Sequence, residues 1–499
     1  MNRPTNGAWR RLRADTGRAF ACPLLAAAAI FVAAVPAGPA AARTIVIQPS
    51  VGTTSEEFEN VANTLQPGDT LVLRGGTYSQ EARRAISVNG TAAQPVVIRA
   101  ADGESPLLTR PIETMDTQNN IEIENSSYLI LRGLRFEGGS TGVRFLGGHH
   151  ITVEDCEIFG TGNNALTMNS GNCDSMVIRR TEIHHTGLSP TGTTEGEGMY
   201  LGCNNNSCRV TNSRFENNYI HHLRATSDGG NDGIEVKVGS SNNMIRNNVI
   251  HDTNIGRRYP GIFVYGGGTA PNIVEGNVIW NSGEAIQVVS DAEIRNNLIL
   301  SSDIGITAAP HTQVSLMKNV TIANNTIYGH DEGIYVRWSG ASNMAIANNA
   351  IYCPNGTAVN ASGLSASLIL ANYVEGTLAG VSLDGEGWFA GGTSASAFRN
   401  APAMDLWPTA SAPFLGRASA SFAPATDFNE RPRTAPPDVG AYERDGASTN
   451  PGWTVQPGFK SIGSSVDVIP PDKVRDLRGR DAAGASAKSS PRSTQRSKP

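Results

Sequence analysis

Short strands followed by asparagine pairs recur through the middle of this chain, and this repeat constrains the fold more than any other feature of the sequence. Each unit opens with a small residue and an alternating apolar pattern, and it ends with an Asn pair or a substitute for one. The second members of the pairs are spaced 30, 29, 20, 28 and 24 residues apart. The pairs are Asn217-Asn218, Asn247-Asn248, Gly276-Asn277, Asn296-Asn297, Asn324-Asn325 and Asn348-Asn349. Short strands at this period, with no helix-length apolar pattern between them, predict a solenoid of stacked coils.

The asparagine pairs indicate which kind of solenoid the repeat forms. Asn tolerates the left-handed backbone conformation that a tight corner requires, and its amide can hydrogen-bond the equivalent amide one coil away. An Asn column at a fixed corner therefore predicts a parallel β-helix, with insertions at the other corners giving the variable spacing. Leucine-rich repeats are excluded because their Leu signature is missing, and propeller blades need repeats of about 40 residues.

Both ends of the chain differ in composition from the repeat. Residues 1–42 carry five arginines ahead of an apolar run, Leu24–Val35, and end in small residues, which predicts a cleaved secretory signal. Residues 43–445 are the predicted β-helix domain, and residues 446–499 are a predicted disordered basic tail. The Leu24–Val35 run is too short to span a bilayer comfortably, and the sequence has no other long apolar stretch. We expect a soluble, secreted monomer, with the periplasm as the alternative location.

Two local features are expected to stabilise the solenoid. Thr54–Leu65 predicts a helix that caps the first coil, with Thr54 and Glu57 as a capping box. In an exported protein Cys203 and Cys208 are expected to form a disulfide, with Cys173 as the competing partner. The sequence shows no C-x-x-C pair and no histidine grouping, which argues against a zinc site.

The net charge limits the possible partners. The whole chain has a formal charge of −5; subtracting the +4 of residues 1–42 and the +5 of residues 471–499 leaves −14 for residues 43–470. An acidic body argues against nucleic-acid binding. An anionic polymer would need local positive charge to bind.

One coil carries more ionisable side chains than the others. Glu235 and Lys237 share a strand face because strand side chains alternate. Alignment of the coils places Glu197 and Asp232 at matched positions just before their strands, with Glu284 at the same position further on. Glu197, Asp232 and Glu235 are therefore expected to converge beside Lys237, and such oxygen ligands suit Ca²⁺. The alternative is a solvated Glu–Lys ladder with little energetic value.

Several of these segments resemble a known family. The stretch Pro67–Tyr78 (P-G-D-T-L-V-L-R-G-G-T-Y), the Asn-punctuated coils and the closing D-V-G-A-Y-E (Asp438–Glu443) resemble secreted right-handed parallel β-helix proteins of the pectate-lyase-like superfamily, particularly the chondroitinase-B and alginate-lyase type. Asn231–Val238 (N-D-G-I-E-V-K-V) is similar to the lysine-bearing strand of family 9 pectate lyases. The resemblance covers about residues 44–443. It implies a right-handed helix and a lyase in which Lys237 is the base and nearby acidic residues hold calcium; Tyr265 stands where the family has an arginine.

The chemistry explains why these residue types would occur together. β-Elimination removes the proton α to a uronate carboxylate, and a bound metal neutralises that carboxylate and stabilises the developing charge. Lysine can act as the base, while Tyr265 could protonate the leaving oxygen or stack on a sugar. The sequence thus favours a secreted, calcium-assisted polysaccharide lyase acting on an acidic polysaccharide.

Further residues are candidates for substrate binding. They are Tyr200, His222, Arg257, Arg258, Phe263 and Arg337. Arg337 is expected three coils from Lys237, about 14 Å by strand spacing, as a distal subsite. A column of His184, His221 and His251 is expected on a different sheet, as surface stacking rather than catalysis.

Three other functions remain open at this point. A C5-epimerase would use the same proton abstraction. An inverting glycoside hydrolase would pair Asp232 with a carboxylate about two coils away, such as Glu284, at roughly 6.5–9.5 Å. A non-catalytic carbohydrate-binding or adhesive β-helix is the third.

Overall fold

The computed structural model describes residues 41–49, 56–80, 83–112, 118–191, 195–226, 229–255 and 258–461. The predicted signal lies outside these ranges except for its last two residues, and so does the predicted tail beyond residue 461. None of the helices in the described ranges is long and apolar enough to cross a membrane.

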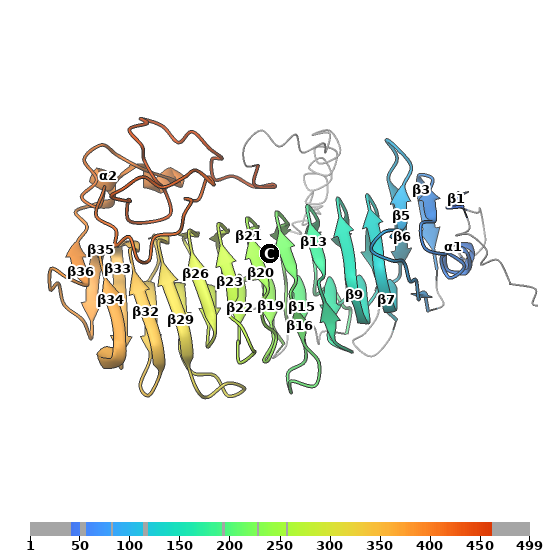
Figure 1. Ribbon diagram of the computed structural model, residues 1–499, viewed down its shortest axis with the longest axis horizontal. Coiled ribbons are helices and arrows are strands. Elements are labelled where there is room, and N and C mark those ends of the chain that lie inside the picture. Colours follow the sequence, from blue (N-terminus) through green and yellow to red (C-terminus); the bar gives the residue numbers. More distant parts are fainter. Residues whose placement is uncertain are drawn as a thin grey trace, which may run out of the picture. The chain divides into compact units, whose positions relative to one another are not determined.

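The described chain winds into successive coils whose strands pair in parallel with those of the coils before and after (Figure 1). Within the described residues, one sheet system contains 36 strands, from β1 (Thr44–Ile47) to β36 (Trp388–Ala390). The early coils use β2 (Thr70–Leu73), β3 (Gly76–Ser79), β4 (Ala85–Ile86), β5 (Val96–Ala100), β6 (Pro106–Arg110), β7 (Ile121–Arg132), β8 (Arg135–Gly138), β9 (Val143–Glu154) and β10 (Glu157–Phe159). The parallel β-helix is thus confirmed.

From the middle of the chain onward each coil contributes one strand to each of three stacks. The first stack is β11 (Leu166–Met168), β15 (Met199–Leu201), β19 (Ile234–Val236), β22 (Ile262–Val264), β25 (Glu284–Val288), β28 (Ile304–Ala308) and β31 (Glu332–Arg337). The second is β13 (Val177–Arg179), β17 (Arg214–Glu216), β20 (Met244–Arg246), β23 (Asn272–Glu275), β26 (Ala292–Arg295), β29 (Lys318–Ala323) and β32 (Ser342–Ala347). The third is β14 (Glu182–His184), β18 (Tyr219–His221), β21 (Val249–His251), β24 (Val278–Trp280), β27 (Leu298–Leu300) and β30 (Thr326–Tyr328).

Further elements complete the coils. Short strands β12 (Cys173–Asp174) and β16 (Val210–Thr211) lie between the first and second stacks in chain order. The last coils use β33 (Ala350–Ser362), β34 (Ser367–Leu370) and β35 (Asn372–Ala379). Beyond β36 come α2 (Ser394–Ala397) and the antiparallel pair β37 (Phe398–Asn400) and β38 (Asp405–Pro408).

The predicted register of the first stack is confirmed. Ile234 pairs with Met199 on one side and Ile262 on the other, and all three are fully buried. The alternate residues form the outward column in which Glu235 lies between Tyr200 and Phe263. The register matters because slipping by one residue would turn the entire outward set into the core.

The asparagine column forms a buried hydrogen-bonded ladder between the second and third stacks. Each side-chain amide donates to the side-chain oxygen of the Asn one coil further on, at 2.9–3.0 Å. The ladder residues are Asn218, Asn248, Asn277, Asn297, Asn325, Asn349 and Asn372. The first Asn of each pair instead supplies the left-handed corner, as at Asn247 with φ 55°. The first member of a pair therefore forms the corner, and the second member forms the hydrogen-bonded ladder.

Helix α1 (Glu56–Ala62) lies within the predicted Thr54–Leu65 helix and buries Phe58 and Ala62. Thr54 of the expected capping box lies outside the described residues. Asn63, just after α1, donates to the carbonyl of Ala85 and accepts from the backbone of Ser87. The role of the helix as a cap on the first coil stays a prediction.

The Cys203–Cys208 disulfide is present, and Cys173 is a buried free thiol. The bond closes a short loop directly after β15. Of the pairings that the sequence left open, Cys203–Cys208 is therefore the one that forms.

The chain after β36 packs on the outward face of the third stack. Trp407, Phe428 and Trp453 join a buried cluster with residues of that stack, including Val249 and Val278.

Residues 446–461, assigned above to the disordered tail, belong to this packed segment, because Trp453 and Lys460 are buried in it. The Lys460 Nζ donates to Asn247 Oδ1 and to the carbonyl oxygens of Gly276 and Phe428. The predicted boundary at residue 445 is too early by at least this segment.

Candidate active site

Lys237 directly follows β19 and is 4% exposed. Its Nζ forms an ion pair with Glu235, two residues earlier on the same face. The same nitrogen lies 4.5 Å from the ring centroid of Tyr200 and 4.8 Å from that of Tyr265, which belong to the coils before and after. Two cation–π contacts and an ion pair therefore fix the position of the amine. The solvated Glu–Lys ladder is wrong, because both side chains are buried.

Three carboxylates meet beside this lysine. Glu197, Asp232 and Glu235 each place one oxygen within 4.8 Å of the others, and all three side chains are buried. Within the described part of the chain, Glu197 Oε2, Asp232 Oδ1 and Glu235 Oε2 have no hydrogen-bond partner. Burial, followed by the charge of Glu235, raises the pKa of Glu197 and of Asp232. Burial also raises the pKa of Glu235, although Lys237 opposes the shift.

The buried unpaired oxygens define what the cluster is suited to hold. A buried carboxylate without a partner is costly, and several close together repel one another. A hard cation with flexible oxygen coordination, such as Ca²⁺, satisfies those oxygens and removes the repulsion. The donor set therefore fits the calcium ion expected from the sequence, with Glu235 shared between the metal and Lys237.

Two aromatic rings and a histidine complete the surroundings of the lysine. Phe263 and Tyr265 stack at 4.1 Å, and the ring of His311 meets Tyr265 edge-on at 4.9 Å. Burial, together with the positive charge of Lys237, lowers the pKa of His311. Burial and the charges of Glu235 and Asp232 raise the pKa of Tyr265, so its hydroxyl stays protonated at neutral pH.

His311 belongs to a loop, residues 309–316, that follows β28 and reaches back along the first stack. Val314 lies beside Gly267, which follows Tyr265, and the Gln313 side chain donates to Asn204 in the disulfide loop at 3.4 Å. Sequence reasoning missed His311, because it lies in an insertion with no periodic signal. Its position opposite Tyr265 arises only because the loop spans several coils.

Some of the other candidates for substrate binding lie beside Lys237, and the rest lie away from it. Tyr200 and Phe263 lie at the lysine, as expected. Arg258 is 62% exposed and paired with Asp303, and Arg257 lies outside the described residues. His222 follows β18 on the third stack, where it lies near Asp252 rather than at the carboxylate cluster.

Arg337 is further from Lys237 than the sequence suggested. Four strand pairings join β19 to β31, through β22, β25 and β28. The separation is therefore about 19 Å rather than 14 Å. Its guanidinium stacks on Tyr335 and donates to Asn360.

Comparison with known proteins agrees with this architecture. A family model described as "Right handed beta helix region" matches residues 88–231 and 224–299, which contain the coils of the site. The chain is a right-handed parallel β-helix protein. No curated protein matches its sequence.

Solved structures similar to this β-helix protein include two polysaccharide lyases and an epimerase. An alginate lyase from Paenibacillus sp. is 19% identical, with 59% of this chain and 97% of that chain covered and a TM-score of 0.44. The pectate lyase Pel9A is 15% identical, with 81% and 96% covered and a TM-score of 0.47. The A-module of an Azotobacter vinelandii mannuronan C-5 epimerase is 16% identical, with 67% and 93% covered and a TM-score of 0.41.

Proposed function

We propose that this β-helix protein is a secreted polysaccharide lyase that cleaves a uronic-acid-containing polysaccharide by β-elimination. The observation that carries the proposal is the placement of the Lys237 amine beside three buried carboxylates with unpaired oxygens. A cation-binding cluster next to an amine provides the two functions that the reaction requires: neutralisation of the uronate and removal of its α proton.

In the proposed reaction Lys237 acts as the base. The amine first loses the proton of its ion pair with Glu235 to solvent. Its unprotonated Nζ then removes the proton on the carbon α to the carboxylate. The electrons of that C–H bond form a carbon–carbon double bond, and the adjacent carbon–oxygen bond breaks toward the leaving sugar. Tyr265, whose hydroxyl is protonated at neutral pH, donates a proton to that oxygen.

Calcium would be held by Glu197, Asp232 and Glu235. When bound there it would neutralise the substrate carboxylate and stabilise the negative charge that develops on it. The orphaned oxygens of the three side chains support this assignment. The ion pair with Glu235 keeps Lys237 at the edge of the same cluster.

Substrate must reach a buried amine. The loop of residues 309–316 contacts the site through His311 and is anchored at its far end by the Gln313–Asn204 hydrogen bond. In the proposed reaction this loop shifts away from Tyr265 when polysaccharide binds. Aromatic Phe263 and Tyr265 then become available as a platform for the sugar.

A substitution of Lys237 by arginine tests the assignment. Arginine keeps the positive charge between Glu235 and the two tyrosines, but it stays protonated and cannot act as a base. We expect Lys237→Arg to lower turnover by at least about 10²-fold on any substrate that the parent cleaves. The measurement is ultraviolet absorbance of the unsaturated uronate, on a panel of pectate, alginate and glycosaminoglycans.

A matched control is Lys318→Arg, because Lys318 is a half-exposed lysine that pairs with Asp291 away from the site. Its turnover should equal that of the parent. Near-native turnover in a folded Lys237→Arg protein would contradict the proposed base.

One specific observation keeps a glycoside hydrolase as the second candidate. Glu284 lies two pairings from the Asp232 coil, and burial raises its pKa, as a general acid requires. New reducing ends without ultraviolet absorbance, lost in Glu284→Gln, would establish this function instead. Inversion at C5 without chain cleavage would identify an epimerase.

A further inference from the structure

The corner that follows the third stack carries a cluster of imidazoles on successive coils. His184 pairs with His221, and His221 pairs with His251, in parallel register. Their rings stack at 5.0 and 5.4 Å, as expected, but His221 and His251 are buried rather than on the surface. The next residues, His185, His222 and Asp252, all have left-handed backbones with φ of 54–55°. They form a second column beside the first, in which an aspartate replaces histidine on the third coil.

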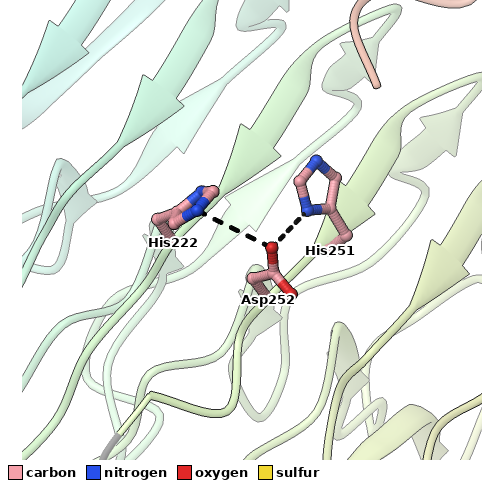
Figure 2. Close-up of side chains that lie close together, drawn as sticks. All are labelled: His222, His251 and Asp252. Atoms are coloured by element: carbon pink, nitrogen blue, oxygen red, sulfur yellow. Dashed lines mark hydrogen bonds and ion pairs between the residues drawn. The ribbon is translucent and has the colours of Figure 1, made fainter. Parts of the chain in front are cut away.

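Three side chains of this corner converge, as Figure 2 shows. Asp252 Oδ2 lies 2.9 Å from His251 Nδ1 and 3.8 Å from His222 Nε2. Each of the three residues offers one ligand atom within 4.8 Å of those of the other two. Ligand atoms around one tetrahedral zinc ion lie about 3.4 Å apart, between these two distances. Two imidazole nitrogens and one carboxylate oxygen are a donor set that zinc accepts readily.

The surrounding hydrogen bonds orient His222 for this task. His221 Nε2 lies 3.2 Å from Glu182 Oε1, and His221 Nδ1 lies 2.7 Å from His222 Nδ1. When His221 donates to the carboxylate from Nε2, its Nδ1 accepts, so His222 donates from Nδ1. That tautomer turns the lone pair of His222 Nε2 toward Asp252. A carboxylate acting through a histidine is a common outer support of a metal-bound imidazole.

Hydrogen bonds to neighbouring residues also orient Asp252 and His251. Asp252 Oδ1 accepts a hydrogen bond from Asn281 on the next coil, which leaves Oδ2 directed at the histidines. His251 Nε2 lies 2.9 Å from the hydroxyl of Tyr219. A tyrosine hydroxyl can donate or accept, so it supports His251 whether or not Nδ1 carries a proton. A metal ion can therefore replace that proton without loss of the outer hydrogen bond.

We propose that His222, His251 and Asp252 bind a divalent transition-metal ion, of which zinc is the best fit. The ion would connect the coil of β18 to the coil of β21 at their shared corner. The His222 side chain is 42% exposed, so an ion can enter from solvent. The site is separate from the carboxylate cluster, which lies on the first stack, and it does not depend on the proposed lyase activity.

Zinc titration of the full chain without a histidine tag tests this site. Calorimetry in excess Ca²⁺ keeps the oxygen cluster occupied by its own preferred ion, so the heat reports the nitrogen-containing site. We expect one zinc ion per chain, release of a proton on binding, and a rise in melting temperature with zinc concentration. His222→Gln and Asp252→Asn should each weaken binding by at least about tenfold.

The matched control is His149→Gln. His149 and His150 form a similar adjacent pair, with their Nδ1 atoms 3.0 Å apart, and His150 stacks on Tyr128. Asp174 pairs in register with His149 on the next coil, but its Oδ1 accepts from Thr211 and Asn212. This variant should bind zinc as the parent does. The proposal is overturned if the parent binds no stoichiometric zinc, if both ligand variants bind it unchanged, or if His149→Gln removes binding as they do. Melting temperatures without metal show whether each variant is folded.

Discussion

The carboxylate cluster on the first stack and the histidine corner on the third stack lie on the same coils but differ in burial and in charge. The first cluster is buried and holds an excess of negative charge beside one lysine. The second is partly exposed, and its hydrogen bonds turn neutral nitrogen atoms toward one carboxylate. Both depend on strand register to bring together residues about 30 positions apart. The same stacked coils therefore bring carboxylate oxygens together on one face and imidazole nitrogens together on another.

Removal of calcium should produce the largest effect and should separate the two clusters. Chelation is expected to abolish lyase activity, and Ca²⁺ should restore it better than Mg²⁺, because the oxygen cluster favours a larger and more flexibly coordinated ion. Activity is measured by uronate absorbance before and after each metal is added. Asp252→Asn, at the histidine corner, should respond to calcium as the parent does. Full activity after exhaustive chelation would remove the metal from the proposed mechanism.

Because Lys237 is buried and His222 is half-exposed, replacing Lys237 should lower the unfolding free energy much more than replacing His222. Lys237→Ala leaves Glu235 buried without its partner, which is expected to cost about 3–5 kcal/mol of unfolding free energy. His222→Gln, at the half-exposed corner, should cost about 1 kcal/mol or less. Denaturant unfolding of the metal-free proteins measures both. Equal losses would mean that the two clusters do not differ in burial as described.

A buried histidine next to the third stack gives a pH test. Burial lowers the pKa of His330 to about 4, so between pH 4 and its ordinary value of about 6.5 the unfolded chain binds a proton that the folded chain does not. Stability is therefore lost as pH falls through this window, by about 3 kcal/mol from this group. His330→Gln should show a correspondingly flatter stability profile between pH 7 and 4. A slope identical to that of the parent would contradict the shift.

The smallest effect concerns the proton donor. Tyr265→Phe keeps the ring that stacks on Phe263 and faces Lys237, but it removes the hydroxyl. We expect turnover to fall about tenfold or more while substrate affinity changes little. Tyr328→Phe, on the third stack, is the control and should leave both unchanged. Retained turnover in Tyr265→Phe would leave Tyr265 as a platform for the sugar only.

Strand register was predictable from the sequence, and so was everything that follows from register alone. The alignment of the small residues correctly placed Tyr200, Glu235 and Phe263 in one column. Convergence of Glu197 and Asp232 on Glu235 followed from the same alignment. These features were accessible because each coil repeats the same local pattern, with the Asn pair marking its corner.

Features that depend on insertions or on chain ends were not predictable. The loop carrying His311 has no periodic signal, so its contact with Tyr265 was missed. The segment ending at Lys460 is rich in Gly and Pro, and its few aromatic residues gave no pattern that would reveal packing. The grouping of His222, His251 and Asp252 was not predicted, because its members come from successive coils and no C-x-x-C pair or local histidine motif marks them.

The asparagine ladder also has an electrical consequence for the whole molecule. Six of the side-chain oxygens accept from the Asn amide of the coil before, and that of Asn218 accepts from the backbone N–H of Thr181. All seven amide carbonyls therefore point in the same direction along the stack. Aligned amide dipoles add, as they do along an α-helix, and each hydrogen bond polarises the next. The ladder is thus a side-chain counterpart of a helix dipole, with its negative end toward the early coils and its positive end toward the late ones. Interrupting it in the middle, for example at Asn297, should weaken the bonds on both sides of the break rather than one corner alone.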